Sequence, residues 1–240
     1  MSIEDALVGL SSSLNRVRSL ANRLIADTGL ALSDSAVREL HETQQCAAVV
    51  LLSGYFEAFL KDLVRRYIDE LSNCGVAFAD LPAAIQHGHF EGGGDVLTKT
   101  SLALRTGRVT PFGNPTPRDV VARLHSAASA AGTYQIVWEA FARTESNPGP
   151  EIVKKIAKSL AVENFWPQVS IRSGNPARWA ETALVAQLSD LISQRNECAH
   201  TGVVAPIPTA AKIIEYVEML DAIATGFTSL LVDELARHTP

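Results

Sequence analysis

Residues 46–60 read CAAVVLLSGYFEAFL, and this stretch decides the fold of the 240-residue chain. It forms the middle of a helical pattern over residues 34–73 that contains no proline and a single glycine, Gly54. Because the stretch is apolar nearly all round, we expect this long helix to lie in the centre of the protein. A glycine inside a helix costs about 1 kcal/mol relative to alanine, so Gly54 predicts the close approach of another helix.

Two amphipathic helices are predicted near the ends of the chain. Residues 3–24 place apolar side chains at alternating steps of four and three, and residues 209–235 carry a similar apolar face. Further helix starts are predicted at Thr116-Pro117 and at Pro150, because a cap followed by proline favours the first turn. With no strand alternation and no internal repeat, the sequence predicts an all-α helical bundle with long core helices, formed as a single domain over residues 1–240.

An irregular, partly helical insertion is predicted at about residues 76–133. Short helical pieces are expected near residues 82–90 and 96–104, separated by three glycines at 92–94, and a loop rich in Gly and Pro follows. His87 and His89 are interpreted as surface histidines, because no cysteine or carboxylate pair accompanies them as a metal site would require. Lys154, Lys155 and Lys158 are interpreted as a solvated helix face, with an RNA-steering patch as the alternative.

Composition indicates a soluble globular protein, with 47% hydrophobic and 20% charged residues. The longest apolar run is too short for a bilayer, the N-terminal residues lack the pattern of a signal peptide, and three widely spaced cysteines suggest a reducing compartment. We therefore expect a cytoplasmic protein with no membrane segment. The net charge of −5 argues against a broadly basic nucleic-acid surface. A local cluster of cations can still hold a few phosphates.

The chemistry is concentrated in residues 184–202, LVAQLSDLISQRNECAHTG. Leu184, Leu188 and Leu191 recur at helical spacing, and Arg195, Asn196 and His200 follow within two turns. At about 100° per residue, the side chains of Arg195 and His200 point roughly 140° apart, so a second surface is needed to bring both onto one ligand. The structural alternative is a solvated Arg and a His that interacts favourably with the helix dipole.

Glu57 is a carboxylate within the apolar central helix. It lies either on the one wet face of that helix or beside a cation, because a buried carboxylate needs a partner. In the second interpretation Glu57 orients Arg195 or His200.

The arrangement of two long helices, an insertion, a helix ending in RNECAH and a closing helix resembles the HEPN family. In that family an Arg, four to six intervening residues and a His form the signature, commonly with a polar residue after the Arg. These positions are Arg195, Asn196 and His200 here. The blocks at 51–63 (LLSGYFEAFLKDL) and 146–166 (SNPGPEIVKKIAKSLAVENFW) also resemble a toxin-like HEPN branch, so the likeness covers most of the chain.

The resemblance implies a metal-independent endoribonuclease that needs no cofactor and acts as a homodimer. Two copies of Arg195, Asn196 and His200 would face one another across a cleft. An Arg and a His from different copies could then reach one ligand, although the two side chains point roughly 140° apart on a single helix. The 2′-hydroxyl of RNA would attack the adjacent phosphorus, with His200 as base or acid and Arg195 gripping the phosphate. Asn196 would donate to phosphate or fix the tautomer of the histidine. A toxin or defence effector controlled by a partner, such as a cognate antitoxin, is the expected biological setting.

Two other functions remain open from the sequence. The first is a non-catalytic HEPN module that binds a nucleotide, RNA or a partner protein, which the acidic balance favours. The second is a metal enzyme, for which the sequence offers no pattern of ligands.

Overall fold

The computed structural model describes residues 2–108, 115–129, 133–144, 148–201 and 206–238, the side chains of residues 200 and 201 excepted. This part of the chain contains nine α-helices, two 3₁₀ turns and no β-strand, which confirms the all-α prediction. The elements are α1 (Glu4–Ala26), α2 (Thr28–Ser33), α3 (Ser35–Ser72), η1 (Phe78–Asp80), α4 (Ala83–Thr106), α5 (Pro117–Ala128), η2 (Trp138–Ala140), α6 (Pro150–Ser159), α7 (Phe165–Arg172), α8 (Glu181–Thr201) and α9 (Ala210–His238).

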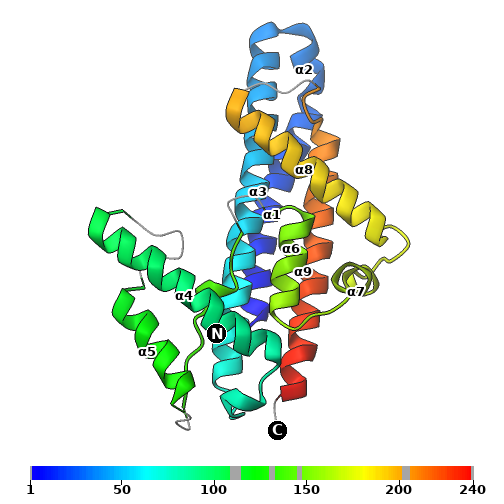
Figure 1. Cartoon of the computed structure of the whole chain (residues 1–240). Helices are drawn as coiled ribbons and strands as arrows, with labels where there is room; N and C mark the ends of the chain where they lie inside the picture. Colours follow the sequence, from blue (N-terminus) through cyan, green and yellow to red (C-terminus); the bar gives the residue numbers. More distant parts are fainter. Residues whose placement is uncertain (1, 109–114, 130–132, 145–147, 202–205, 239–240) are drawn as a thin grey trace.

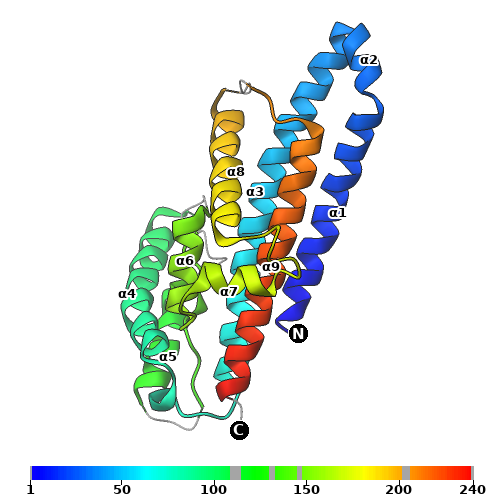
Figure 2. The same ribbon diagram turned by 90° about the vertical axis from the view of Figure 1, so that its right-hand side faces the viewer.

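Three of the four longest helices run side by side and form the centre of the molecule. Helices α1, α3 and α9 each pack against the other two along much of their length (Figures 1 and 2). Leu52, Phe56 and Leu60 in the middle of α3 are completely buried, so the prediction that this helix lies in the core is confirmed. None of the described helices has a stretch long and apolar enough to cross a membrane.

Helices α3 and α5 begin at the capping residues expected from the sequence. The Asp34 side chain accepts from the backbone N–H groups of Ala36 and Val37 and thereby caps α3. Thr116 and Asp119 form a reciprocal capping box at the start of α5, with Pro117 as its first residue. Caps of this kind satisfy backbone donors that the first turn of a helix otherwise leaves without partners.

Helix α8 crosses the bundle obliquely and packs on α3 and α9, as Figure 1 shows. Helix α7, which the sequence analysis does not predict, packs against α9. A Cβ at Gly226 of α9 would lie 2.9 Å from the backbone oxygen of Val169 in α7, so only glycine allows this close approach. The short helix α2 is likewise absent from the sequence-based prediction, because six residues carry too little periodicity to be recognised.

Helices α4 and α5 lie beside the bundle in the segment expected to be irregular (Figure 2). The prediction of two short helices separated by the three glycines is wrong, because α4 continues through them. Gly92 and Gly93 are buried, and a Cβ there would lie 2.6 Å from the Cβ of Ala140 and 2.7 Å from Cδ2 of Leu124, respectively. The glycines thus allow η2 and α5 to pack closely on α4, and this packing outweighs their low helix propensity.

Two other expectations are not met within the described part of the protomer. A Cβ at Gly54 would meet nothing within 4 Å, so no helix of the same protomer approaches there in the described part of the chain. His87 is exposed as predicted, but His89 is completely buried, and its Nδ1 accepts a 3.1 Å hydrogen bond from the backbone N–H of Val137. The helical period places His89 on the face of α4 that packs against η2, which the isolated QHGHF motif does not reveal.

Candidate functional site

Helix α8 carries the three residues of the signature. Its leucines Leu184, Leu188 and Leu191 are completely buried, as the spacing predicts, and they fix α8 on the bundle. Arg195 and Asn196 follow on the next turn and are half-buried. The Arg195 Nη1 donates a 3.1 Å hydrogen bond to the Asn196 side-chain oxygen, which holds the two side chains together.

His200 lies in the last turn of the same helix, and its side chain falls outside the described residues. Because the backbone of α8 is helical from Arg195 to His200, the two positions are separated by roughly 140° around the helix axis. The catalytic roles of Arg195, Asn196 and His200 therefore stay predictions.

Glu57 comes from α3 and lies in a network of hydrogen bonds. Its Oε1 accepts from Lys61 Nζ at 2.7 Å and from Thr144 Oγ1 at 2.7 Å. The Glu57 side chain is 20% exposed, and the Thr144 residue is buried. The network thus joins α3 to the segment that follows η2.

The electrostatics of Glu57 place Arg195 in the same neighbourhood. Burial raises the pKa of the Glu57 carboxyl, but the hydrogen bonds from Lys61 and Thr144 and the charges of Lys61 and Arg195 outweigh burial, so the pKa is lowered. Glu57 is therefore ionised at neutral pH. Arg195, one of the two partners expected from the sequence, acts on it electrostatically, and the side chain of the other, His200, lies outside the described residues. Whether Glu57 orients Arg195 during a reaction remains a prediction.

Lys61 and Thr144 are members of the network that the sequence analysis does not identify. Lys61 could have been found, because it stands four residues after Glu57, the spacing at which opposite charges meet on a helix. Thr144 lies 87 residues after Glu57 in an irregular segment, and no local sequence pattern predicts the contact between them.

Cys198 lies between Arg195 and His200 in the sequence and anchors this end of α8. It is buried, and burial together with a hydrogen bond to the Cys46 thiol of α3 raises the pKa of Cys198 to about 12. A thiol with such a pKa stays protonated at neutral pH, so Cys198 is a packing residue and not a nucleophile.

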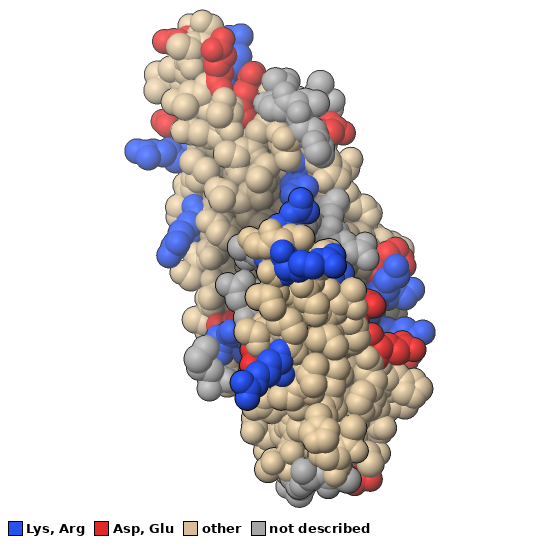
Figure 3. Space-filling model, turned by 60° about the vertical axis from the view of Figure 1, so that its left-hand side comes forward, with Lys and Arg blue, Asp and Glu red and all other residues tan. Residues whose placement is uncertain are grey.

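The surface charge is uneven although the chain is acidic overall. On the face shown in Figure 3, Lys and Arg side chains gather across the middle, while Asp and Glu lie mainly at the top and edges. The described part of the molecule therefore offers local groups of cations for binding anions.

Among the described residues no three His, Cys, Asp or Glu side chains come together as a metal site would need.

Within this all-α bundle, α8 carries a cation and an amide joined by a hydrogen bond, and the cation acts electrostatically on a carboxylate of α3. Comparison with protein families matches residues 16–233 to the family described as RiboL-PSP-HEPN, so the chain belongs to this HEPN family. Comparisons with curated proteins and with solved structures found no match. Membership in the family suggests a nuclease or another RNA-related role.

Proposed function

We propose that the protein is a metal-independent endoribonuclease that cleaves RNA through attack of the 2′-hydroxyl on the adjacent phosphorus. The observation that carries the proposal is the RNECAH signature at residues 195–200, placed on α8 within a chain of the HEPN family. Each bond change in this reaction needs only proton transfer and stabilisation of negative charge, which the residues of the signature can supply.

In the proposed reaction a His200 imidazole removes the proton of the 2′-hydroxyl, and the 2′-oxygen forms a bond to phosphorus. The bond from phosphorus to the 5′-oxygen breaks, and a second, protonated His200 gives that oxygen its proton. Unperturbed histidine has a pKa of about 6.5, so both forms exist near neutrality. The products are a 2′,3′-cyclic phosphate and a 5′-hydroxyl.

Arg195 stabilises the negative charge that builds up on the phosphate oxygens, because guanidinium can donate two parallel hydrogen bonds to them. Asn196 holds the Arg195 side chain through its 3.1 Å hydrogen bond and can donate to phosphate through its amide. Glu57, ionised and electrostatically coupled to Arg195, acts as a positioning residue.

A homodimer supplies the second histidine and the second arginine. Supporting this, α3 carries an uncharged exposed stripe with steps of seven, four, three and four residues, which places its members on one helix face. The stripe consists of Leu40, Ala47, Leu51, Gly54 and Ala58, and Leu40 and Leu51 are 55% and 43% exposed. The open space over Gly54, which no helix of the same protomer fills, suits the close approach of a helix from a second copy.

The dimer is tested by replacing Leu51 with Asp and measuring the mass in solution by light scattering. We expect Leu51→Asp to be monomeric and inactive, while Leu104→Asp on α4, where the leucine is 74% exposed, keeps the mass and activity of the wild type. A Leu51→Asp protein of unchanged mass would exclude the stripe as the interface.

The activity is tested by incubating the protein with tRNA and with mRNA in the presence of a chelator. We expect cleavage that leaves 2′,3′-cyclic phosphate ends, no cleavage of DNA, and a loss of roughly 10²-fold or more in Arg195→Ala and His200→Ala. Intact RNA with the wild-type protein, indistinguishable from the double variant, would contradict the proposal.

The biological setting proposed is a toxin or defence effector of the cytoplasm, acting as one domain over residues 1–240 and controlled by a cognate antitoxin or regulatory protein. Production of the wild-type chain should arrest growth, and production of Arg195→Ala should not. Normal growth with an amount of wild-type protein that cleaves RNA in vitro would argue against a toxin.

The alternative is a non-catalytic HEPN module that binds a nucleotide, RNA or a partner protein. The net charge of −5 and the engagement of Arg195 with Asn196 favour it. It predicts ligand binding that survives His200→Ala, with no cleavage under any condition.

A further inference from the structure

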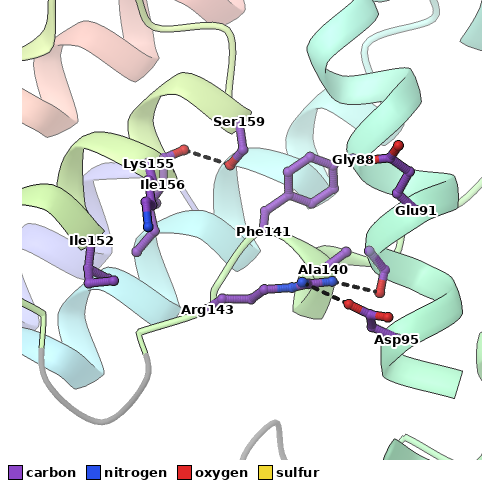
Figure 4. A pocket seen from close by; sticks show the side chains of 11 residues that line it. Gly88, Glu91, Asp95, Ala140, Phe141, Arg143, Ile152, Lys155, Ile156 and Ser159 are labelled. Atoms are coloured by element: carbon purple, nitrogen blue, oxygen red, sulfur yellow. Dashed lines mark hydrogen bonds and ion pairs between the residues drawn. The ribbon is translucent and has the colours of Figure 1, made fainter. Parts of the chain in front are cut away.

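A pocket of about 370 Å³ lies between α4, η2 and α6, and none of the predicted signature residues is among those that line it. Figure 4 shows its two walls, with Lys155 on α6 and Glu91 and Asp95 on α4. Ala140, Phe141 and Arg143, from η2 and the residues after it, lie between these walls. Its volume is in the range of pockets that bind small molecules.

The Arg143 side chain joins the segment after η2 to α4 at the pocket. It reaches toward α4, where its Nη1 lies 3.0 Å from the Asp95 carboxylate and its Nη2 donates a 3.2 Å hydrogen bond to the Gly92 carbonyl (Figure 4). These contacts neutralise Asp95 and hold the segment after η2 against α4. The pocket is therefore a formed feature of the fold.

Two opposite charges remain on facing walls of the pocket. Lys155 and Glu91 are both exposed, and neither forms an ion pair within the part of the chain that the structure describes. Lys154 and Lys158, also on α6, are exposed and likewise form no ion pair with described residues. The α6 wall thus favours an anionic group, and the α4 wall favours a group that donates hydrogen bonds.

The pocket is linked to the signature through consecutive residues. Arg143 lines the pocket, and the next residue, Thr144, donates the 2.7 Å hydrogen bond to Glu57. Helix α6 also packs on α8, which carries Arg195. The pocket and the neighbourhood of Glu57 therefore share one segment of the chain, and α6 joins the pocket to the signature helix.

We propose, on the basis of the endoribonuclease function above, that this pocket is a subsite for one nucleotide flanking the scissile phosphate. Lys155 binds a backbone phosphate of that nucleotide. Glu91 accepts hydrogen bonds from N–H groups of the base, and the half-buried Ile152 side chain contacts its ring, above a floor to which the buried Phe141 and Ile156 contribute. Guanine fits this arrangement best, because its N1–H and amino group lie on one edge and can both donate to one carboxylate.

The phosphate contact is tested by binding of 2′-O-methyl oligonucleotides, which have no free 2′-hydroxyl and cannot be cleaved by the proposed reaction. Fluorescence anisotropy over a salt titration measures the affinity for Lys155→Gln and for the control Arg16→Gln, an exposed cation on α1. We expect Lys155→Gln to bind about threefold to tenfold more weakly and to reduce the salt slope by about 0.7. Arg16→Gln should match the wild type.

The base contact is tested with the same method and oligonucleotides that differ only in the base. Wild-type protein should prefer 2′-O-methylguanosine over 2′-O-methyluridine oligomers, and Glu91→Gln should lose that preference without a change in salt slope. The control Glu39→Gln removes an exposed carboxylate from α3 and should keep the preference.

The result that overturns the subsite is oligonucleotide binding that neither Lys155→Gln nor Glu91→Gln alters, whether or not the wild type cleaves RNA. Failure of the proposed function gives a different result, namely unmethylated RNA that binds but stays intact. Because the binding measurement needs no cleavage, the two outcomes are separable.

Discussion

The Thr144 hydroxyl donates a 2.7 Å hydrogen bond to the Glu57 carboxylate, although 87 residues separate the two in the sequence. Thr144 is buried, and the carboxylate it contacts is also bound by Lys61. The segment after η2 therefore helps to hold Glu57 in its ionised form, in which it interacts electrostatically with Arg195.

Replacing Thr144 with Val should remove this hydrogen bond with little change in shape. We expect a loss of about 1–3 kcal/mol in the free energy of unfolding, measured by urea denaturation at pH 7, because the bond is made to a charged group. If Glu57 positions Arg195, RNA cleavage should fall as well. The control Thr98→Val, at an exposed position whose hydroxyl donates to the Gly94 carbonyl of its own helix, should change neither.

The same variant should change the acid dependence of stability. The pKa of Glu57 is lower in the folded protein than in the unfolded chain, so its contribution is present above about pH 4.3 and is lost as the pH falls through the folded-state pKa. Thr144→Val raises the folded-state pKa toward the unfolded value, and the loss of stability below pH 5 should become shallower. An unchanged acid limb would contradict the role assigned to the hydrogen bond.

We expect a second loss of stability in acid, separate from that of Glu57, because of the buried His89 side chain. Burial lowers the pKa of His89 to about 4, so between about pH 6.5 and 4 the unfolded chain binds a proton that the folded protein does not. The contribution of His89 to stability should fall by about 3 kcal/mol over this interval and then level off. In His89→Asn, whose amide oxygen can still accept from the Val137 N–H, this loss should disappear. His87→Asn, at an exposed position on the same helix, should retain it.

Two glycines of α4 provide a matched pair of substitutions. Gly94→Ala should raise the free energy of unfolding by up to about 1 kcal/mol, because a Cβ there meets nothing within 4 Å and alanine favours the helix. Gly92→Ala should destabilise, because its Cβ would lie 3.2 Å from the Ala140 Cα as well as 2.6 Å from its Cβ. Thermal unfolding of both variants measures the difference, and equal effects would contradict the close packing of η2 on α4.

Arg123 pairs with Glu139, a carboxylate only 2% exposed, at 3.0 Å. Arg123→Ala should cost about 3–5 kcal/mol at pH 7, because it leaves a buried charge without a partner. Burial already raises the pKa of Glu139, and a raised folded-state pKa means that the protonated form stabilises the fold. The deficit of Arg123→Ala should therefore shrink as the pH falls, and adding Glu139→Gln should recover much of it at pH 7. If Arg123→Ala lowers the free energy of unfolding equally at pH 7 and pH 4, an unpaired Glu139 charge is not the cause of the destabilisation.

The long helices were predictable because their apolar periodicity, caps and prolines are local signals. Asp34, Thr116 and Pro150 begin helices where expected, and the leucines of α8 are buried as their spacing predicts. The continuity of α4 was not predictable, because the glycines that favour a break are retained in a helix by contacts with Ala140 and Leu124, which are distant in sequence.

The contacts around Glu57 and Arg195 were predictable only in part. Arg195, Asn196 and Glu57 are suggested by residue type and position, and Lys61 follows from helical spacing. Thr144 and the pocket beside Arg143 depend on how an irregular segment folds back on α3 and α4, which no periodic pattern encodes.

Helix α5 packs mainly on α4, and α4 in turn contacts η2 and α6, so this pair of helices is joined to the bundle through few elements. Such peripheral units open by local unfolding more readily than a buried central helix, and amide hydrogen exchange in α4 and α5 should outpace that in α3. Each opening that frees the segment after η2 would also release Thr144 from Glu57. The fraction of molecules in which Thr144 holds the Glu57 carboxylate is then governed by the local stability of helices that contribute no residue to that contact.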